Sequence, residues 1–325
     1  MHALTAALQR IGYALVLILA VIIFNFSLIH LAPGDPADVI AGEMGGASPE
    51  LMAQIRHSYG LDRSFLAQLL IYLGKALHGD LGTSLYFNSP VTSLILQRVP
   101  ATLLLVVTAL TTAIVAGTLL GVAASRRPNG LVSHLVTVLA LIGFSAPIFW
   151  TGIVLIIVFA SAVPIFPVGG MYDVTRSGGS FVGGALDVAH HLVLPALTLA
   201  IVYLAQYSRL ARASMLEVLS ADYVRTARAK GLPERLVVFK HALRNAILPV
   251  VTVAGLQFSQ VFAGAVLVEA VFNWPGLGRL AYESILRRDT PTLLGILLGA
   301  AVIVIAVNVL TDLSYRIIDP RIRTS

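Results

Sequence analysis

Long apolar segments alternate with polar segments along the whole chain. Six of the apolar segments are long enough to cross the hydrocarbon core of a membrane, which takes a helix of about 20 residues. They cover residues 11–31, 100–124, 131–163, 190–207, 246–272 and 293–310. A backbone in hydrocarbon must satisfy its own hydrogen bonds, so each segment is predicted to be helical. The predicted fold class is therefore an all-α polytopic membrane protein with six transmembrane helices.

Two of these segments have features of their own. Residues 11–31 follow Arg10 and carry no charge over 21 residues. A signal-peptide core is shorter, about 7–15 residues, so we interpret the segment as a retained first helix. Residues 131–163 are longer than one straight span needs, and Pro147 inside them predicts a kink.

The polar segment 32–99 is too long for a simple connection. Ser48, Pro49 and Glu50 are typical of a helix start, with a capping hydroxyl, a proline and an acid in order. Apolar residues then recur at helical spacing over residues 65–77, between two basic residues. We expect a helix packed on a surface there, rather than a further span.

The remaining polar segments carry turn residues. Ser89 and Pro90 predict a turn that opens a short helix leading into the second span. Residues 164–189 are rich in glycine and residues 273–292 contain the sequence WPGLG, so both are predicted to be loops. The first outer segment, residues 32–99, is expected to form a packed periplasmic cap.

The composition excludes several classes of protein. The chain is 57% hydrophobic and 12% charged, with a mean hydropathy of +0.87. Soluble domains carry about a quarter charged residues, so this is a membrane protein. The absence of cysteine excludes disulfides, thiolate metal sites and cysteine nucleophiles. None of the three lysines follows a glycine-rich phosphate loop, so the chain is not expected to hydrolyse nucleotide itself.

The charges predict the orientation. If the N-terminus is cytoplasmic, the inner segments hold 14 of the 22 basic residues and five of the 16 acidic residues. An excess of lysine and arginine in short loops marks the cytoplasmic side, so both termini are predicted to lie inside. The net charge of +6 therefore reflects topology, not affinity for nucleic acid.

One inner segment is unusually basic. The eight lysines and arginines between positions 209 and 244 are Arg209, Arg212, Arg225, Arg228, Lys230, Arg235, Lys240 and Arg244. The turn from Gly231 to Glu234 ends one helical pattern and starts another. Such a helix–turn–helix is either a solvated loop or a surface that docks on a protein outside the bilayer.

Ionisable residues are almost absent from the span interiors. Glu269 lies near the outer end of the fifth span and Asp312 near the inner end of the sixth. Membrane-embedded ionisable groups normally mark ion-coupled transport, so an ion-coupled secondary transporter is disfavoured. No H-E-x-x-H or G-x-S-x-G motif is present, which disfavours an intramembrane hydrolase. Adjacent His190 and His191 point to different faces of a helix, which argues against a metal site.

A few uncharged polar residues remain inside the spans. They are Asn25, Thr108, Thr111, Thr112, Gln206, Gln257, Ser259, Gln260 and Asn308. Most are expected to form hydrogen bonds between helices. Gln257 and Gln260, three residues apart on one helix face, are the preferred candidates for lining a polar conduit. Gly117, Gly121, Gly255 and Gly264 are expected to allow close helix packing.

The order of residues in the basic segment is specific. It reads ADYVRTARAKGL over residues 221–232, continues as HALRNA over 241–246 and ends in Leu248-Pro249. Further stretches of the same character are HLAPGDPA (30–37), HGDLGTS (78–84), VFNWPGLGRL (271–280), RRDTP (287–291) and DPRIR (319–323). Together they resemble the permeases of binding-protein-dependent ABC importers, most closely the first permease subunit of the peptide/nickel branch.

The chain departs from the broad permease pattern in two places. Arg225-Thr226-Ala227 stands where that pattern has Glu-Ala-Ala, and residues 241–244 replace its Ile-x-Leu-Pro ending. These departures are usual in the peptide/nickel branch.

The resemblance implies a type I ABC importer permease fold and a set of partners. These are a homologous second permease subunit, two ABC ATPase subunits, a periplasmic substrate-binding protein and the bilayer of a bacterial inner membrane. No cofactor is expected in this chain, because ATP and Mg would be bound by the ATPases. The residues implied to contact an ATPase are Arg225, Thr226, Ala227, Arg228, Lys230, Gly231, Leu232, Pro233, Glu234, Arg235 and Leu236.

The implied organisation has three parts. Residues 1–97 hold the first transmembrane helix and a periplasmic helical segment, and residues 98–316 form the permease core with its cytoplasmic coupling loop at 210–245. Residues 317–325 form a cytoplasmic tail. The expected function is passage of dipeptides and oligopeptides by alternating access. Import of nickel complexes, glutathione or another small solute remains open at this stage.

Overall fold

The computed structural model describes residues 2–31, 48–58, 62–84, 86–173 and 180–318, which are mostly helical. The chain forms two compact units, residues 1–97 with 281–309 and residues 98–280 with 310–325. We call them the first and second unit. The tail from residue 319 and most of the HLAPGDPA stretch lie outside the described residues.

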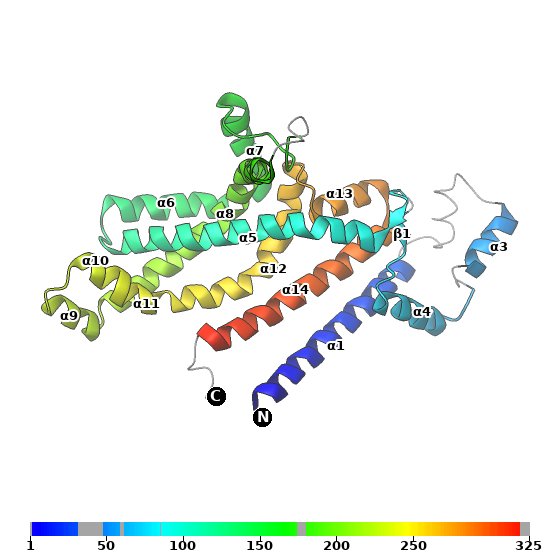
Figure 1. Cartoon of the computed structure of the whole chain (residues 1–325), viewed down its shortest axis with the longest axis horizontal. Helices are drawn as coiled ribbons and strands as arrows, with labels where there is room; N and C mark the ends of the chain where they lie inside the picture. The colour runs from blue at the N-terminus through cyan, green and yellow to red at the C-terminus, as the bar shows by residue number, and fades with distance from the viewer. Residues whose placement is uncertain (1, 32–47, 59–61, 85, 174–179, 319–325) are drawn as a thin grey trace. The chain divides into compact units, whose positions relative to one another are not determined.

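Figure 1 labels most of the elements of both units. In chain order they are α1 (His2–Leu31), α3 (Pro49–Ser58), α4 (Phe65–Leu77), β1 (Thr83–Ser84), β2 (Ser89–Pro90), α5 (Val91–Ser125), α6 (Leu131–Ser145), α7 (Ile148–Ile156), the π-helix η1 (Ile157–Ala162), α8 (Phe181–Leu219), α9 (Asp222–Ala229), α10 (Glu234–Leu236), the π-helix η3 (Val237–Ala242), α11 (Leu243–Ala246), α12 (Leu248–Val271), α13 (Leu277–Arg287) and α14 (Thr290–Ile318).

The predicted helical fold is confirmed. Four helices in the described residues are long and apolar enough to cross a membrane, namely α5, α8, α12 and α14. The pair formed by α6 and α7–η1 makes a fifth span if it crosses once. The first predicted span is helical throughout as α1, and its residues Gly12–Leu28 form an apolar helix. The count of six spans stays a prediction.

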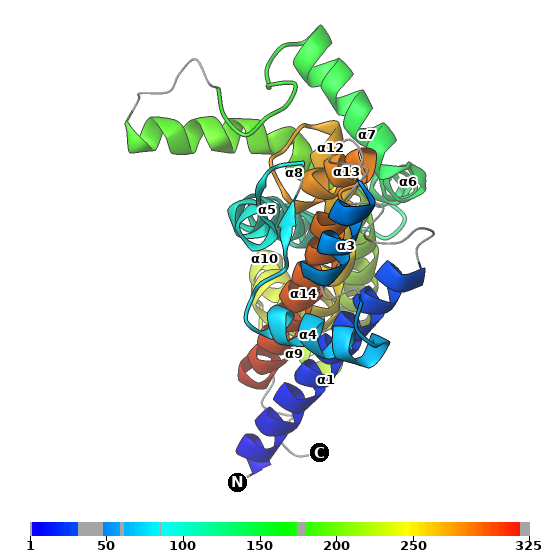
Figure 2. The same ribbon diagram turned by 90° about the vertical axis from the view of Figure 1, so that its right-hand side faces the viewer.

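A sharp break separates α6 from α7. The two helices differ in direction by 107°, a change visible in Figure 2. Pro147 causes it, because proline lacks an N–H and keeps the residue before it out of the helical conformation. Ala146 accordingly has an extended backbone, with ψ of 133°. The predicted kink is confirmed, and it is a complete break.

Helix α8 is the centre of the second unit and packs against α6, α7 and α12. It has 39 residues. A helix of that length extends about 58 Å, more than the roughly 30 Å of hydrocarbon in a bilayer. Its contact with α5 depends on two predicted glycines. A Cβ at Gly117 would lie 2.8 Å from Cβ of Tyr207, and one at Gly121 would lie 2.6 Å from the Ser208 carbonyl oxygen. The prediction of close packing is confirmed at these two positions.

The two predicted loops were partly wrong. Helix α13 fills residues 277–287 of the second loop. Helix α8 begins at Phe181, because Ser180 caps it by accepting a hydrogen bond from the Gly183 N–H at 3.2 Å. The glycines and the WPGLG sequence were interpreted as loops because such residues favour turns. In the structure they lie at or near the starts of the two helices.

The predicted short helix before the second span was also wrong. Ser89 and Pro90 form β2, which pairs antiparallel with β1, and α5 then runs without a break from Val91. Pro100 lies inside α5. The start of α3 at Pro49 is confirmed, with the Leu51 N–H donating to the Ser48 hydroxyl at 3.3 Å.

The first unit is held together by contacts between distant segments. The ring of Phe26 on α1 lies 5.1 Å from that of Phe65 and 5.7 Å from that of Tyr72, both on α4. Asn25 donates to the Leu294 carbonyl on α14 at 3.0 Å. Helix α4 has no buried residue, consistent with the predicted surface helix.

Candidate functional site

The basic segment folds into a compact hairpin of short helices at one end of the second unit (Figure 1). We call residues 222–246 the basic elbow. Helix α9 ends where Gly231 adopts a left-handed φ of +76°, a conformation that favours glycine. Pro233 then caps α10, and its carbonyl accepts from the Leu236 N–H at 2.8 Å. The predicted helix–turn–helix is confirmed.

Two apolar clusters hold the elbow. In the first, Val224 and Ala227 of α9 are buried against Val237, and half-buried Leu232 packs on them. This cluster joins the two arms of the elbow, the first formed by α9 and the second by α10 to α11.

The second cluster joins the elbow to the spans. Val238, Ala242 and Ala246 are buried against Val122 of α5 and Met215 of α8. The elbow is therefore closely packed against two of the candidate spans.

An ion pair spans the turn of the elbow. Two guanidinium nitrogens of Arg228 donate to the Glu234 carboxylate, Nη2 to Oε1 at 2.9 Å and Nε to Oε2 at 3.2 Å. This hydrogen-bonded pair lowers the pKa of Glu234 below its ordinary value and raises the pKa of Arg228. Both side chains are about half exposed, so the pair shapes the turn more than it stabilises the fold.

The structure places the predicted contact residues unevenly. Ala227 is buried and Leu232 is half-buried inside the elbow, while the other nine are exposed. Around the second arm a shallow groove of about 430 Å³ forms between Pro233, Arg235, Leu236, Phe239 and Lys240. Phe239 and Lys240 were missed by the sequence analysis. Their spacing of three and four residues from Leu236 on a helix was the signal that could have found them.

The two predicted conduit glutamines form part of a cluster. Gln257 Nε2 donates to the Gln260 carbonyl oxygen at 3.0 Å and to that of Gln206 on α8, also at 3.0 Å. Gln257 is buried, Gln206 is half-buried and Gln260 is exposed. Gln257 and Gln260, which the sequence predicted to share a helix face, are hydrogen-bonded to each other. The structure adds Gln206 as their partner across the interface with α8.

Backbone N–H groups of the VFNWPGLGRL stretch donate to Glu269, which lies near the end of α12. The fully buried carboxylate accepts from Thr102 Oγ1 at 2.7 Å, from the Gly278 N–H at 2.6 Å and from the Arg279 N–H at 3.2 Å. Thr102 in turn accepts from the Leu277 N–H at 2.8 Å. These are the first N–H groups of α13, so the carboxylate and the hydroxyl together cap that helix. A side chain at Gly276 would overlap the carboxylate, which explains the glycine.

The RRDTP and HGDLGTS stretches meet in the same way in the first unit. Buried Asp289 precedes α14 and accepts from the hydroxyls of Thr292 at 2.7 Å and Ser84 at 2.5 Å. Two of the stretches that carried the resemblance thus join the β-hairpin to the start of α14.

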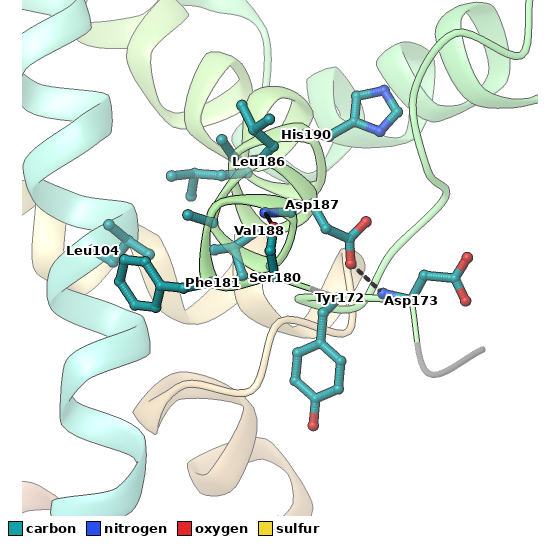
Figure 3. Close-up of a pocket in the computed structure, with 14 residues that line it drawn as sticks. Leu104, Tyr172, Asp173, Ser180, Phe181, Leu186, Asp187, Val188 and His190 are labelled. Carbon is teal, nitrogen blue, oxygen red and sulfur yellow. Dashed lines mark hydrogen bonds between the residues drawn. The ribbon is translucent and has the colours of Figure 1, made fainter. Parts of the chain in front are cut away.

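A groove of the second unit lies at the start of α8 (Figure 3). It has a volume of about 1130 Å³ and is lined mainly by α8 with Leu104 and Tyr172. Within it, the Asp187 carboxylate accepts from the Asp173 backbone N–H at 2.7 Å. His190 Nε2 lies 2.8 Å from the Ile165 carbonyl oxygen.

The neighbouring histidines have separate partners, as expected of different helix faces. His190 pairs with the Ile165 carbonyl, whereas His191 Nδ1 lies 2.9 Å from the Asp187 carbonyl oxygen.

The long apolar helices, with the elbow packed against two of them, are typical of a polytopic membrane protein. Residues 113–324 match the family of binding-protein-dependent transport system inner membrane components. Residues 4–106 match the N-terminal part of the same class of transport proteins. The chain belongs to this family of inner membrane transport components.

Several named relatives cover nearly the full length. The chain is 41% identical to the dipeptide transport system permease protein DppB of Escherichia coli K12, over 97% of this chain and 98% of that protein. It is 42% identical to the di/tripeptide transport system permease protein DppB of Pseudomonas aeruginosa, over 97% of each chain. It is also 42% identical to a putative peptide permease of Brucella suis biovar 1, over 98% of each chain.

A solved structure shares the fold. The inward-facing MetNI methionine ABC transporter matches with a TM-score of 0.55 and 18% identity, over 70% of this chain and 96% of that one. This likeness supports the permease fold and nothing about the solute.

Proposed function

We propose that the protein is one permease subunit of an ATP-driven importer of short peptides. The observation that carries the proposal is the identity of 41% and 42%, over almost the whole length, to permeases named for dipeptide and di/tripeptide transport. The chain would form half of the translocation path, and a homologous second permease would form the other half. A periplasmic binding protein would deliver the peptide.

The proposed role of the basic elbow is to dock on an ATPase subunit. Arg225, Lys230 and Arg235 are exposed and can pair with acids, and the groove beside Leu236 and Phe239 can accept an apolar side chain. A few well-placed apolar contacts usually decide the affinity of such interfaces. Because the elbow packs on α5 and α8, closure of two ATPases would reach the spans, while this chain itself would be non-catalytic.

The proposed arrangement in the membrane has six spans with both termini in the cytoplasm. It counts α1 as the first span and the broken pair α6 with α7–η1 as one span. The separation of basic and acidic residues supports this orientation.

Reconstitution tests the function. The chain would be purified with its second permease and ATPases, placed in liposomes and supplied with the binding protein and labelled dipeptide. Uptake should require ATP inside and no ion gradient. Uptake of another solute instead of peptide would contradict the proposed substrate. Uptake by this chain alone, driven by a proton gradient, would refute the whole proposal.

Docking is tested in the same complex. Leu236→Asp should reduce the amount of ATPase that co-purifies with the permeases, because a charge would enter the apolar groove. Leu286→Asp introduces the same charge at an exposed leucine of α13 and should retain the ATPase. Equal retention in both variants would contradict docking through the elbow.

A further inference from the structure

Three glutamines, Gln206 of α8 with Gln257 and Gln260 of α12, lie at the interface of these two helices. Gln257 and Gln260 lie nine and twelve residues into α12. These positions are about 13–18 Å along the helix axis, inside the hydrocarbon thickness that a spanning helix crosses. A primary amide exposed to lipid would leave donors and acceptors unsatisfied at a high cost in free energy. Exposed Gln260 therefore faces something other than lipid.

The face of α12 that carries Gln260 is continuous. Thr252, Leu256, Gln260, Ala263 and Leu267 recur at helical spacing and are all exposed. Thr252 Oγ1 donates to the Leu248 carbonyl oxygen of its own helix at 3.0 Å. Gln260 lies at the middle of this face and is linked to half-buried Gln206 through Gln257.

The hydrogen-bond pattern leaves the Nε2 donors of two glutamines available. The Gln257 Nε2 group donates to the side-chain carbonyl oxygens of both Gln206 and Gln260, and each of these oxygens keeps a second lone pair. No described residue accepts from the Nε2 groups of Gln206 or Gln260. The cluster thus presents neutral N–H donors, beside amide oxygens that are already partly used, and no formal charge.

We infer that this glutamine cluster, defined as Gln206, Gln257 and Gln260, binds the main-chain carbonyl groups of the peptide as it passes. The inference deepens the proposed function and depends on it. Neutral donors suit a carbonyl that every peptide shares, and they do not select among side chains of different charge. This matches a path that must admit many peptides after the binding protein has selected them.

A modified peptide tests the carbonyl contact. A thioxo dipeptide keeps the backbone of the ordinary oxo form, but its sulfur is larger than oxygen and is a weaker hydrogen-bond acceptor. In the reconstituted complex, Gln260→Met should slow uptake of the oxo dipeptide about three- to tenfold, the value of one hydrogen bond of about 1 kcal/mol. Uptake of the thioxo dipeptide should change less than about twofold, because the lost contact was already weak.

The ratio of the two uptake rates separates this role from a structural one. The binding protein is the same in every assay, so its own preference cancels when the variant is compared with the wild type. A purely structural glutamine would slow both peptides equally, and that result would overturn the inference. Gln97→Met makes the same change at an exposed position of α5 and should leave the ratio unchanged.

Chemical labelling tests whether water reaches the α12 face that carries Gln260. The chain has no cysteine, so Gln260→Cys introduces a single thiol. In inverted vesicles holding the full complex, a charged thiol reagent should label this position, and dipeptide should protect it. Leu135→Cys, at an exposed leucine of α6, should remain unlabelled if it faces lipid. An unlabelled Gln260→Cys would show that lipid or a partner helix covers the cluster, and would overturn the inference.

The two proposals fail in different ways. If the wild-type complex takes up no peptide with ATP, the proposed function fails before the variants matter. If uptake is normal while the ratio and the labelling do not respond at Gln260, only the inference fails.

Discussion

Glu269 shows how a single buried side chain determines local structure. Its carboxylate and the Thr102 hydroxyl satisfy the first N–H groups of α13, which would otherwise be buried without acceptors. Glu269→Ala should therefore destabilise the protein by about 2 kcal/mol or more, the range for losing a helix cap and leaving buried donors unpaired. The midpoint of thermal unfolding in detergent measures the effect. Asp222→Ala, which removes a carboxylate that is 97% exposed, should shift the midpoint little. Equal shifts would contradict the capping role.

Gly231 makes a different kind of prediction, because only its backbone is constrained. An added Cβ would contact nothing within 4 Å, yet φ is +76°. Gly231→Val should strain the turn by about 1–2 kcal/mol and raise the ATP hydrolysed per peptide imported. Gly231→Asn should stay near the wild type, since asparagine tolerates this conformation. If both variants coupled normally, the turn geometry would have no part in coupling.

At the scale of the element, the Arg228–Glu234 pair sets the shape of the elbow. The pair is half exposed. Such a pair contributes about 0.2–1 kcal/mol, so Arg228→Glu should weaken coupling by about 1.4-fold to fivefold. Exchanging both residues, as Arg228→Glu with Glu234→Arg, keeps the net charge and should restore coupling. The measurement is ATP hydrolysed per peptide imported. A double variant no better than the single one would show that the pair does not act through the turn.

The pH dependence of the pair follows from its pKa shifts. Arg228 lowers the pKa of Glu234. The contribution of the pair is therefore complete above the ordinary glutamate pKa of about 4.3 and is lost as the pH falls through the lower folded value. Arg228 stays charged throughout because its own pKa is raised. Coupling should therefore be the same at about pH 6 and about pH 8, far above that window. A decline between these values, absent from the exchanged variant, would contradict this assignment.

The sequence predicted elements better than their ends. Hydrophobic length located the spans because hydrocarbon demands helical backbone, and Pro147 located the break in α6–α7. Helix α13 was missed because its cap is formed by tertiary contacts, with Thr102 far away in the sequence and Glu269 at the end of the preceding helix. In the site, spacing found Gln257 and Gln260. Gln206 lies 51 residues away, and only the packing of α8 on α12 brings it to them.

At the scale of the whole molecule, a continuous chain of contacts joins the elbow to the spans. Val238, Ala242 and Ala246 pack on α5 and α8, and α8 reaches α12 through the glutamine cluster. A displacement of the elbow therefore reaches the face that we propose contacts the peptide without passing through a loop. The role of the elbow nevertheless requires that it lie on the cytoplasmic side.

The broken pair α6 with α7–η1 decides that orientation. If the pair crosses the membrane once, Asn129 and Lys230 lie on the same side and Val168 lies on the other; if it returns to its own side, Val168 joins Asn129 and the elbow moves outside. The excess of basic residues around the elbow favours a single crossing. In the cysteine-free chain, Val168→Cys should react with an impermeant thiol reagent on intact cells, whereas Asn129→Cys and Lys230→Cys should react only after permeabilisation. Labelling of Lys230→Cys on intact cells would place the elbow where no cytoplasmic ATPase can reach it.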